Sequence, residues 1–344
     1  MVKLSILDKV ERTCRIFDET LSDKQRVVLA YSGGKDSTVV ALLFYEWVKR
    51  REEDLNVIII HNDTLGEIPL MEFWARSFMK FYVKKLDEIG VNAKYELLMP
   101  KASETFYWRT IIRGYPAPNF KFRWCIWLLK RNPTRRYLRA QRSEIALLLG
   151  VRDDESSFRS ASLKKRSFSC PLARVGCTAR YLLESDDVQS KVAPIRDWSV
   201  DEVWSYLYHH REEFRLNQLF ILYAVADSLN VRYGCWHCTL VNKQLPHYFL
   251  GEGYLMLEAA RIFYRLISDI TDLRIPKNRG YSRLGPLNLT GRGLVLYVTR
   301  LAEKLSGIRL YGLDEARLDG YTLRQIFYEM DEAEAQEIIR RVER

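Results

Sequence analysis

Hydrophobic residues in the first 200 positions alternate between short continuous runs and helical stripes. The runs are typical of strands buried on both faces of a parallel sheet, and they cover Val27–Tyr31, Asn56–His61, Ala93–Met99, Ile145–Leu149 and Val192–Ile195. Helical stripes follow the first two runs, over residues 39–47 and from about Pro69 to Ile89. Strands that alternate with helices predict an α/β fold with a Rossmann-like, doubly wound parallel sheet.

Beyond residue 200 the pattern becomes mainly helical. The stripes lie at about 201–210, 217–229, 254–271, 291–305 and 322–342. We therefore expect two domains, an α/β domain over 1–200 and a helical C-terminal domain over 201–344 that carries the CxxC. Near the N-terminus one helical face gathers apolar residues, which predicts a packed first helix and no signal peptide: Leu7, Val10, Cys14, Phe17 and Leu21.

Composition narrows the class of protein. With 47% hydrophobic and 28% charged residues among 344, the chain is globular in character. No apolar run approaches the roughly 18 residues that span a membrane, so we expect no membrane partner. The six cysteines are few and scattered, and no export signal is evident. We therefore expect a cytoplasmic protein with reduced thiols, some of which could ligate a metal or a cluster.

The net charge of +10 is concentrated in one segment. Residues 101–142 hold eleven Lys or Arg, one acid (Glu104) and nine aromatic residues, and we call them the basic-aromatic segment. A second stretch, Arg274–Arg292, contains no acid. Cations neutralise phosphates and aromatic rings stack on unpaired bases, so a nucleic-acid partner is indicated. The alternative is a solvated basic surface over core aromatics.

A glycine turn supplies the first candidate chemistry. Between a predicted strand and a predicted helix stands Ser32-Gly33-Gly34-Lys35-Asp36-Ser37. Glycine lets the backbone approach an anion, and the N–H groups and dipole of a helix N-terminus attract it. Lys35 adds a cation, the two serines add hydroxyls, and Asp36 could cap the helix or orient a metal-bound water. The pattern predicts a phosphate site.

This hexapeptide resembles the PP-loop of ATP pyrophosphatases. The resemblance implies an adenine nucleotide alpha hydrolase-like fold that cleaves ATP, with Mg²⁺, between the α and β phosphates. It assigns phosphate binding to residues 32–37 and catalysis to Lys35, Asp36, Ser37 and Arg152. Ligands of such sheets bind at the carboxyl ends of strands, so Asp63 and Thr64 are expected near the adenosine.

The strand ending at Leu149 leads into a second candidate motif. Arg152 and Arg159 of Gly150–Arg159 could clamp phosphate or sulfate; the alternative is a surface salt-bridge cluster. The segment resembles G-x-R-x-x-E-S-x-x-R of the phosphoadenosine phosphosulfate (PAPS) reductase-like branch, which would make Gly150, Arg152 and Arg159 nucleotide-binding. Ala193–Trp204 resembles the same branch, and Ser199 with Glu202 forms a capping-box pattern there.

Cys235-Trp236-His237-Cys238 is a CxxC, which could be redox-active or could ligate zinc or iron–sulfur. With its flanking residues it resembles DndC, the PP-loop protein of DNA phosphorothioation, as does Arg123-Trp124-Cys125 with Lys130. That family implies a [4Fe–4S] cluster on four cysteines, of which Cys125, Cys235 and Cys238 match three. Residues 239–344 contain no cysteine, so Cys177 or Cys170 could be the fourth ligand, or one iron could be open. Zinc is the alternative metal.

The leading hypothesis is therefore ATP-dependent sulfur transfer to nucleic acid. The resemblance favours DNA as the acceptor, with a cysteine desulfurase or another sulfur donor and further sulfur-modification proteins as partners. A tRNA thiolase would use the same chemistry. A PAPS or adenylyl-sulfate reductase shares the fold, but its family carries a catalytic cysteine near the C-terminus, and this chain has none after Cys238. A non-enzymatic nucleotide-binding scaffold is the fourth hypothesis.

Overall fold

The computed structural model divides the chain into two compact units. It describes residues 5–22, 24, 26–51, 55–141, 144–155, 181–183, 190–225, 233–240, 252–276 and 284–309. Unit 1 comprises Met1–Asn62, Pro69–Leu98 and Thr134–Val231, and unit 2 comprises Asp63–Ile68, Met99–Pro133 and Arg232–Arg344. Most of the basic-aromatic segment thus groups with the chain after residue 232. A domain boundary at residue 200 stays a prediction.

The described part of unit 1 contains one six-stranded sheet, in the order β3-β2-β1-β4-β6-β5. Its strands are β1 (Arg26–Ala30), β2 (Asn56–Asn62), β3 (Asn92–Leu98), β4 (Ala146–Leu149), β5 (Leu182–Leu183) and β6 (Ser190–Val192). All neighbours pair in parallel except β5 with β6. The order reverses between β1 and β4, and such a switch point is where open α/β sheets bind ligands. The predicted α/β fold is confirmed.

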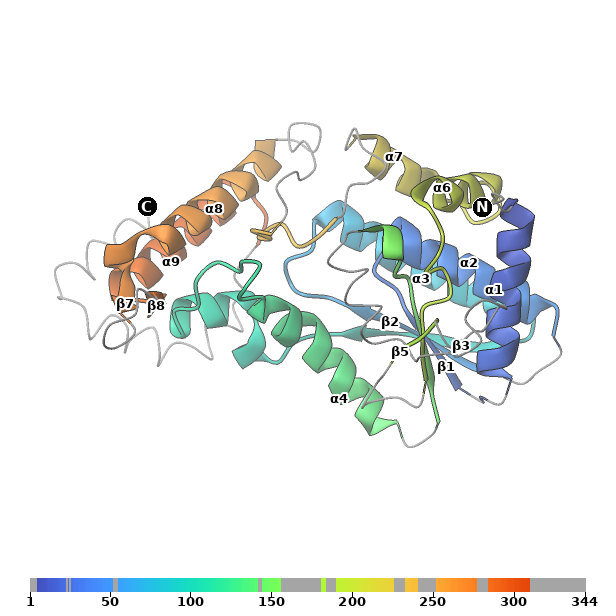
Figure 1. Cartoon of the computed structure of the whole chain (residues 1–344). Helices are drawn as coiled ribbons and strands as arrows, with labels where there is room; N and C mark the ends of the chain where they lie inside the picture. Colours follow the sequence, from blue (N-terminus) through green and yellow to red (C-terminus); the bar gives the residue numbers. More distant parts are fainter. Residues whose placement is uncertain are drawn as a thin grey trace. The chain divides into compact units, whose positions relative to one another are not determined.

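Helices cover both faces of this sheet. They are α1 (Ile6–Leu21), α2 (Lys35–Lys49), α3 (Pro69–Asp87), α4 (Asn132–Ala140), α6 (Val200–His209) and α7 (Asn217–Val225). In Figure 1, α1, α2 and α3 lie on one side of the strands and α4 lies on the other. Val28, Ile58 and Leu147 form one buried cluster with Leu138 of α4. Burial on both faces explains why these strands are continuous apolar runs.

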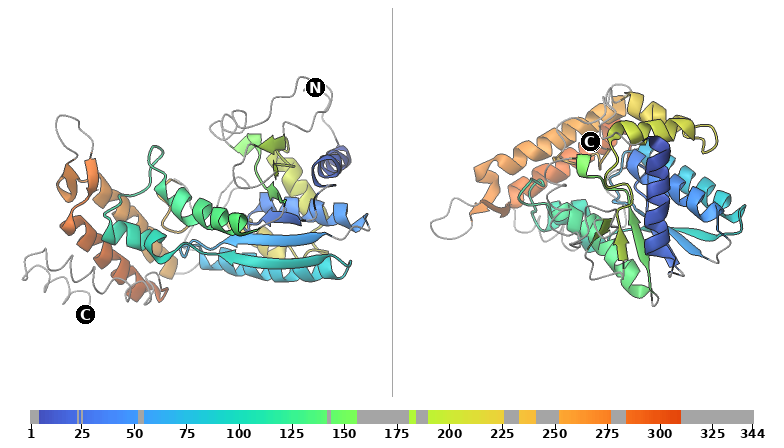
Figure 2. Two further views of the ribbon diagram at one scale, coloured as in Figure 1. Left: turned by 90° about the horizontal axis from the view of Figure 1, so that it is seen from below. Right: turned by 45° about the vertical axis from the view of Figure 1, so that its right-hand side comes forward.

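Unit 2 is mainly helical among its described residues. Its α8 (Glu252–Asp269) and α9 (Leu289–Ser306) lie side by side (Figure 2), next to the antiparallel strands β7 (Arg274–Pro276) and β8 (Leu284–Leu287). Two π-helices, Trp108–Ile112 and Ile126–Arg131, lie in the basic-aromatic segment. The helical C-terminal part is therefore confirmed, and Cys125 is the N-cap of the second π-helix.

Several local predictions differ from the structure. Leu7 is 71% exposed, whereas Val10, Cys14, Phe17 and Leu21 are buried as expected. The strand expected over Val192–Ile195 instead ends at Val192. The short strands β5, β7 and β8 were not predicted, because two to four residues carry too little pattern. The stripe at 322–342 lies outside the described residues.

Candidate nucleotide site and cysteine site

The turn after β1 brings the backbone against α3. Gly33 has a φ of 77°, and a Cβ there would lie 2.9 Å from Cβ of Ala75. The Nε1 of Trp74 donates a hydrogen bond of 2.9 Å to the carbonyl of Gly33. Gly34 is the N-cap of α2 and offers no side-chain cap to its first turn. The structure thus forms the predicted glycine turn at a helix N-terminus, a geometry suited to an anion.

Two serine hydroxyls close the turn on itself. The Ser37 hydroxyl donates to the Gly34 carbonyl at 2.9 Å and accepts from the Ser32 backbone N–H at 3.2 Å. The hydroxyls of Ser32 and Ser37 are 3.1 Å apart. These bonds place both hydroxyls at the start of α2, where the sequence predicted them.

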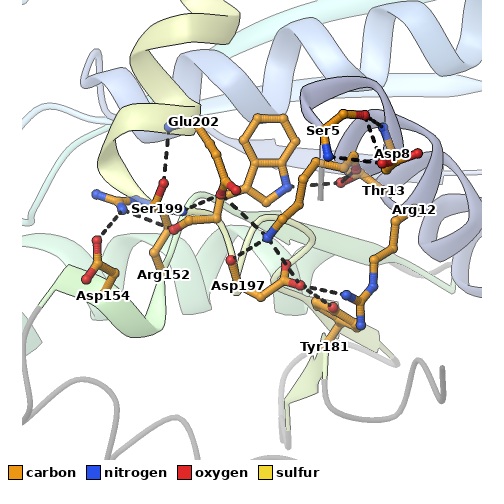
Figure 3. Close-up of polar contacts among 12 residues, drawn as sticks. Ser5, Asp8, Arg12, Thr13, Arg152, Asp154, Tyr181, Asp197, Ser199 and Glu202 are labelled. Carbon is orange, nitrogen blue, oxygen red and sulfur yellow. Dashed lines mark hydrogen bonds and ion pairs between the residues drawn. The ribbon is translucent and has the colours of Figure 1, made fainter. Parts of the chain in front are cut away.

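Asp36 lies between two cations. Its Oδ1 is 2.6 Å from Nε of Arg152, and its Oδ2 is 3.5 Å from Nζ of Lys35. Arg152 is 2% exposed; its guanidinium also donates to the Trp198 carbonyl at 3.2 Å and pairs with Asp154 at 3.4 Å (Figure 3). The structure therefore uses Arg152 to hold Asp36. Its expected contact with an anion stays a prediction.

The carboxyl end of β4 touches the start of α2. A Cβ on Gly150 would lie 2.7 Å from the backbone nitrogen of Ser37, so only glycine allows this approach. Tyr223 of α7 also contacts the start of α2. Its hydroxyl accepts a hydrogen bond of 3.3 Å from the Lys35 backbone N–H, and Lys35 Nζ lies 5.3 Å from the Tyr223 ring centroid. Gly150 was predicted at this rim. Tyr223 was not, because nothing in its local sequence marks it.

A buried histidine at the end of β2 also escaped prediction. His61 Nδ1 is 2.9 Å from the Tyr31 carbonyl, and its Nε2 is 2.9 Å from a carboxylate oxygen of Glu72. Arg76 pairs with the same carboxylate. Burial would raise the pKa of Glu72, but the hydrogen bonds and charges of His61 and Arg76 outweigh it and lower that pKa. The group links β1, β2 and α3 beside the turn.

Asp63 and Thr64 belong to unit 2. The Thr64 hydroxyl donates to a carboxylate oxygen of Glu67 at 2.9 Å and lies 3.1 Å from Sγ of Cys235. The Asp63 carboxylate accepts from the N–H of Leu65 at 2.8 Å. Thr64 is thus part of the surroundings of a cysteine. Its expected place near an adenosine stays a prediction.

The CxxC lies against the segment Asp63–Ile68. Glu67 and Cys235 form an antiparallel bridge, and the Trp236 N–H donates to the Gly66 carbonyl at 2.8 Å. Within the motif the Cys238 N–H donates to the Cys235 carbonyl at 2.9 Å. Cys235 and Cys238 therefore lie in one turn, and the segment Asp63–Ile68 holds that turn by backbone hydrogen bonds.

A carboxylate, Glu67, and a cation, Lys130, lie beside these thiols. Lys130 Nζ lies 3.7 Å from a carboxylate oxygen of Glu67, and this carboxylate, ahead of the nearby thiols, raises the pKa of Lys130. Burial, with a smaller effect of Cys238, raises the pKa of Cys125 to about 11. Burial and then Glu67 raise the pKa of Cys235. Without a metal both thiols would be protonated near neutral pH.

His237, inside the CxxC, is buried without a hydrogen-bond partner for either ring nitrogen among the described residues. Its ring stacks on Phe106 with centroids 3.7 Å apart. A Cβ on Gly66 would lie 1.9 Å from His237 Cε1, so the ring packs directly on that glycine. Burial lowers the pKa of His237 to about 3. The side chain is thus neutral and acts as a packing group.

Three of the predicted metal ligands lie in unit 2 and form no disulfide bond among the described residues: Cys125, Cys235 and Cys238. Arg159, Cys170 and Cys177 lie outside the described residues. Within the part of the chain that is described, no three His, Cys, Asp or Glu side chains form a site for a single metal ion. A [4Fe–4S] cluster differs from a single ion, because each ligand binds a separate iron.

The basic-aromatic segment divides into buried and exposed rings. Phe106, Tyr107 and Trp124 are buried, whereas Phe120, Phe122 and Trp127 are exposed. The Arg131 guanidinium lies 3.9 Å from the Trp127 ring centroid. Some rings of this segment therefore belong to the core of unit 2 and others lie at its surface, and a nucleic-acid partner for the exposed rings stays a prediction.

None of the helices in the described ranges is long and apolar enough to cross a membrane.

Comparisons with known proteins place most of this chain in one family. The family described as phosphoadenosine phosphosulfate reductase domain matches residues 26–241, more than half of the chain. No curated protein matches the chain.

Solved structures resemble it more distantly. A Candida auris phosphoadenylyl-sulfate reductase is 15% identical, with a TM-score of 0.38, over 70% of this chain and 99% of that one. A Candida glabrata FMN adenylyltransferase is 13% identical, with a TM-score of 0.38, over 81% and 70%. A U34-tRNA thiolase from Methanococcus maripaludis, with its [4Fe–4S] cluster, is 17% identical, with a TM-score of 0.32, over 73% and 80%.

Proposed function

Because the chain belongs to the phosphoadenosine phosphosulfate reductase domain family, we propose that it is an enzyme that adenylates an acceptor with ATP and then replaces the activated oxygen by sulfur. The observation that carries this proposal is the intact Ser32–Ser37 turn at the switch point of the sheet. Gly150 and Arg152, from the end of β4, meet that turn at Ser37 and Asp36.

The geometry supports binding of a triphosphate at this turn. Gly33 and Gly34 allow the backbone to approach the phosphates, and the N-terminus of α2 attracts their charge. Lys35 would neutralise phosphate oxygens and Ser37 would donate to them. Asp36, fixed by Arg152, would hold the water shell of Mg²⁺. The metal would supply positive charge that neutralises the leaving group.

The reaction would proceed in two displacements. An acceptor oxygen attacks the α-phosphorus, the bond to the β-phosphate breaks, and pyrophosphate leaves with the electron pair. Lys35 and the α2 N-terminus would stabilise that leaving charge. A sulfur nucleophile then attacks the activated acceptor atom, the bond to the bridging oxygen breaks, and AMP leaves. Ser32 and Ser37 would keep the phosphates in line during the first displacement.

The cysteine site supports the sulfur half of the proposal. Cys125, Cys235 and Cys238 would ligate a [4Fe–4S] cluster, with a fourth ligand from Cys177, Cys170 or an exogenous sulfur species; zinc is the alternative metal. When bound, the cluster would supply or activate the sulfur. The chain's own contribution is a half-buried site in which Lys130 offsets thiolate charge and the segment at Thr64 and Glu67 fixes Cys235.

A nucleic-acid acceptor is supported by charge and exposed rings. The net charge is +10, and Arg131 over the exposed Trp127 forms a cation-aromatic surface on which a base could stack. The resemblance to DndC favours a DNA backbone phosphate, with a cysteine desulfurase as sulfur source; tRNA is the second acceptor to test.

The test is pyrophosphate release from ATP by anaerobically purified protein with measured iron and sulfide. We expect release stimulated by DNA. Stimulation by tRNA would move the proposal to a thiolase. No release under any condition would contradict adenylation and leave a nucleotide-binding scaffold.

A PAPS reductase is the second candidate function, because the matching family bears that description. The absence of any cysteine after Cys238 counts against it. Sulfite produced from PAPS with a thiol reductant, without ATP cleavage, would favour the reductase.

A further inference from the structure

Unit 2 contains a cavity of about 190 Å³ that the proposed reaction does not use. It is lined by residues 116–120, by Thr239 and Leu240 directly after the CxxC, and by α8 and the start of β7. Its volume is below the roughly 300 Å³ typical of pockets for drug-sized ligands. A ligand held there is therefore a small group.

Much of the wall is fixed by its own hydrogen bonds. The Thr239 hydroxyl donates to the Pro118 carbonyl, and the Ala117 N–H donates to the Ser268 hydroxyl at 2.8 Å. Arg274 donates to the carbonyls of Ser268 and Gly285. These groups shape the cavity but have little capacity left for a ligand.

Three other groups in the wall keep hydrogen-bonding capacity. Arg265 and Asp269 are four residues apart on α8 and carry opposite charges, yet they form no ion pair within the described residues, and both are exposed. Asn119 uses its carbonyl oxygen to accept from the N–H groups of Lys121 and Phe122, both at 2.9 Å. Its amide nitrogen is then the atom left to donate. The cavity thus offers two donors and one acceptor.

An aromatic ring completes the wall. Phe120 is 69% exposed, and the Arg123 guanidinium lies 5.2 Å from its ring centroid. An exposed ring beside hydrogen-bonding groups of both kinds matches a planar heterocycle, whose face stacks and whose edge both donates and accepts.

From these observations we infer that the cavity takes one unstacked nucleobase of the acceptor strand. This inference rests on the proposed nucleic-acid acceptor. Arg265, Asn119 and Asp269 bind the edge of the base, and Phe120 stacks on its face. Because Thr239 follows Cys238 in the chain, the captured base fixes which nucleotide stands beside the cysteine site. The cavity is then a determinant of sequence preference.

The experiment uses the full chain and a single-stranded oligonucleotide that carries 2-aminopurine, whose fluorescence rises when the base leaves its stack. Anisotropy reports binding separately. We expect wild-type protein to bind and to raise the fluorescence. Arg265→Ala and Phe120→Ala should each weaken binding about tenfold and abolish the rise. Both side chains are exposed, so folding is preserved. Arg15→Ala removes the same charge from an exposed site on α1 and should bind within about twofold of wild type.

Three results would overturn the inference. If the oligonucleotide binds but its fluorescence stays at the free value, and both cavity variants bind as Arg15→Ala does, the cavity takes no base while the proposed acceptor stands. If neither DNA nor tRNA binds wild-type protein, the inference and the proposed acceptor fail together. Loss of binding in Arg265→Ala that Arg265→Lys restores fully would show a charge effect and would also contradict base recognition.

Discussion

The candidate nucleotide site in unit 1 and the cysteine site in unit 2 are built by different means. The first stands where two parallel strands and a helix start meet, and its charged groups Lys35, Asp36 and Arg152 hold one another. The second stands on loops and a π-helix, and it buries a histidine whose ring nitrogens have no hydrogen-bond partner in the described part of the chain. In unit 1 the regular order of strands and helices places backbone N–H groups where a phosphate would bind. The cysteine site instead depends on the close packing of irregular segments.

The largest expected effect separates the two sites by their chemistry. Ser37→Ala removes the hydroxyl that binds the turn and would contact the phosphates, so we expect pyrophosphate release to fall at least about 100-fold. The iron content should not change. Release is measured with labelled ATP, and Ser205→Ala, an exposed serine on α6, is the control. Wild-type turnover in Ser37→Ala would contradict the assignment of the turn.

The converse change addresses the cysteine site. Cys235→Ser replaces a thiolate, the soft ligand that iron–sulfur clusters prefer, by a hydroxyl. Most of the iron and its visible absorption should therefore be lost. Basal ATP cleavage should survive, because the turn in unit 1 is untouched. Cys14→Ser, in the core of α1, is the matched control and should keep its iron. Full iron in Cys235→Ser would remove this residue from the ligand set.

A smaller effect tests the close packing of unit 2. In Gly66→Ala the new methyl would overlap the His237 ring, which lies 1.9 Å from an ideal Cβ, so we expect a loss of about 1–3 kcal/mol in the free energy of unfolding and weaker iron retention. Denaturant unfolding and iron analysis measure both. The double variant Gly66→Ala/His237→Ala should recover part of the loss, because the ring is gone. Purely additive losses would contradict the contact.

The smallest effect concerns the pH dependence of unit 1. His210 Nε2 of the α6 C-cap is 3.0 Å from Glu46 of α2. Burial would lower the pKa of His210, but the hydrogen bonds and charges of Glu46 and Glu213 outweigh it and raise that pKa. The unfolded state then binds fewer protons, so the contribution to stability is complete below the unfolded pKa of about 6.5 and is lost as pH rises through the folded pKa.

His210→Gln should therefore cost on the order of 1 kcal/mol near pH 5.5 and far less near pH 9. Urea unfolding at both pH values measures it. His209→Gln is the control, since His209 is exposed on the same helix and makes no ion pair among the described residues. A loss for His210→Gln that is the same at both pH values would contradict the ion pair.

The sequence predicted unit 1 far better than unit 2. The run ending at Tyr31, the glycines at 33 and 34 and the stripe after Lys35 together define strand, turn and helix, since each is a local pattern. Gly150 was expected at the same rim as the turn, because the carboxyl ends of parallel strands share one edge of the sheet. Its close approach to Ser37 is known only from the structure. Tyr223 and His61 were missed, because their partners are distant in sequence.

In unit 2 the motifs located Cys125, Cys235 and Cys238, but not their surroundings. A β-bridge joins Glu67 to Cys235, which lies more than 160 residues further along the chain, and Lys130 pairs with Glu67 beside it. No local sequence pattern encodes these contacts. Neither π-helix was predicted, because the apolar stripe of a single turn does not distinguish a π-helix from an α-helix. Arg152 carried a predicted anion contact, whereas its geometry makes it a support for Asp36.

The order of the two units along the chain has a consequence for dissecting the protein. The backbone passes between them at residues 62–63, 68–69, 98–99, 133–134 and 231–232. No single cut releases one unit whole and free of the other, and a truncation at residue 200 would remove both cysteines of the CxxC while keeping Cys125. Neither site can therefore be produced without the other as a fragment of the chain. Point variants of the full chain are needed to assign an activity to each site.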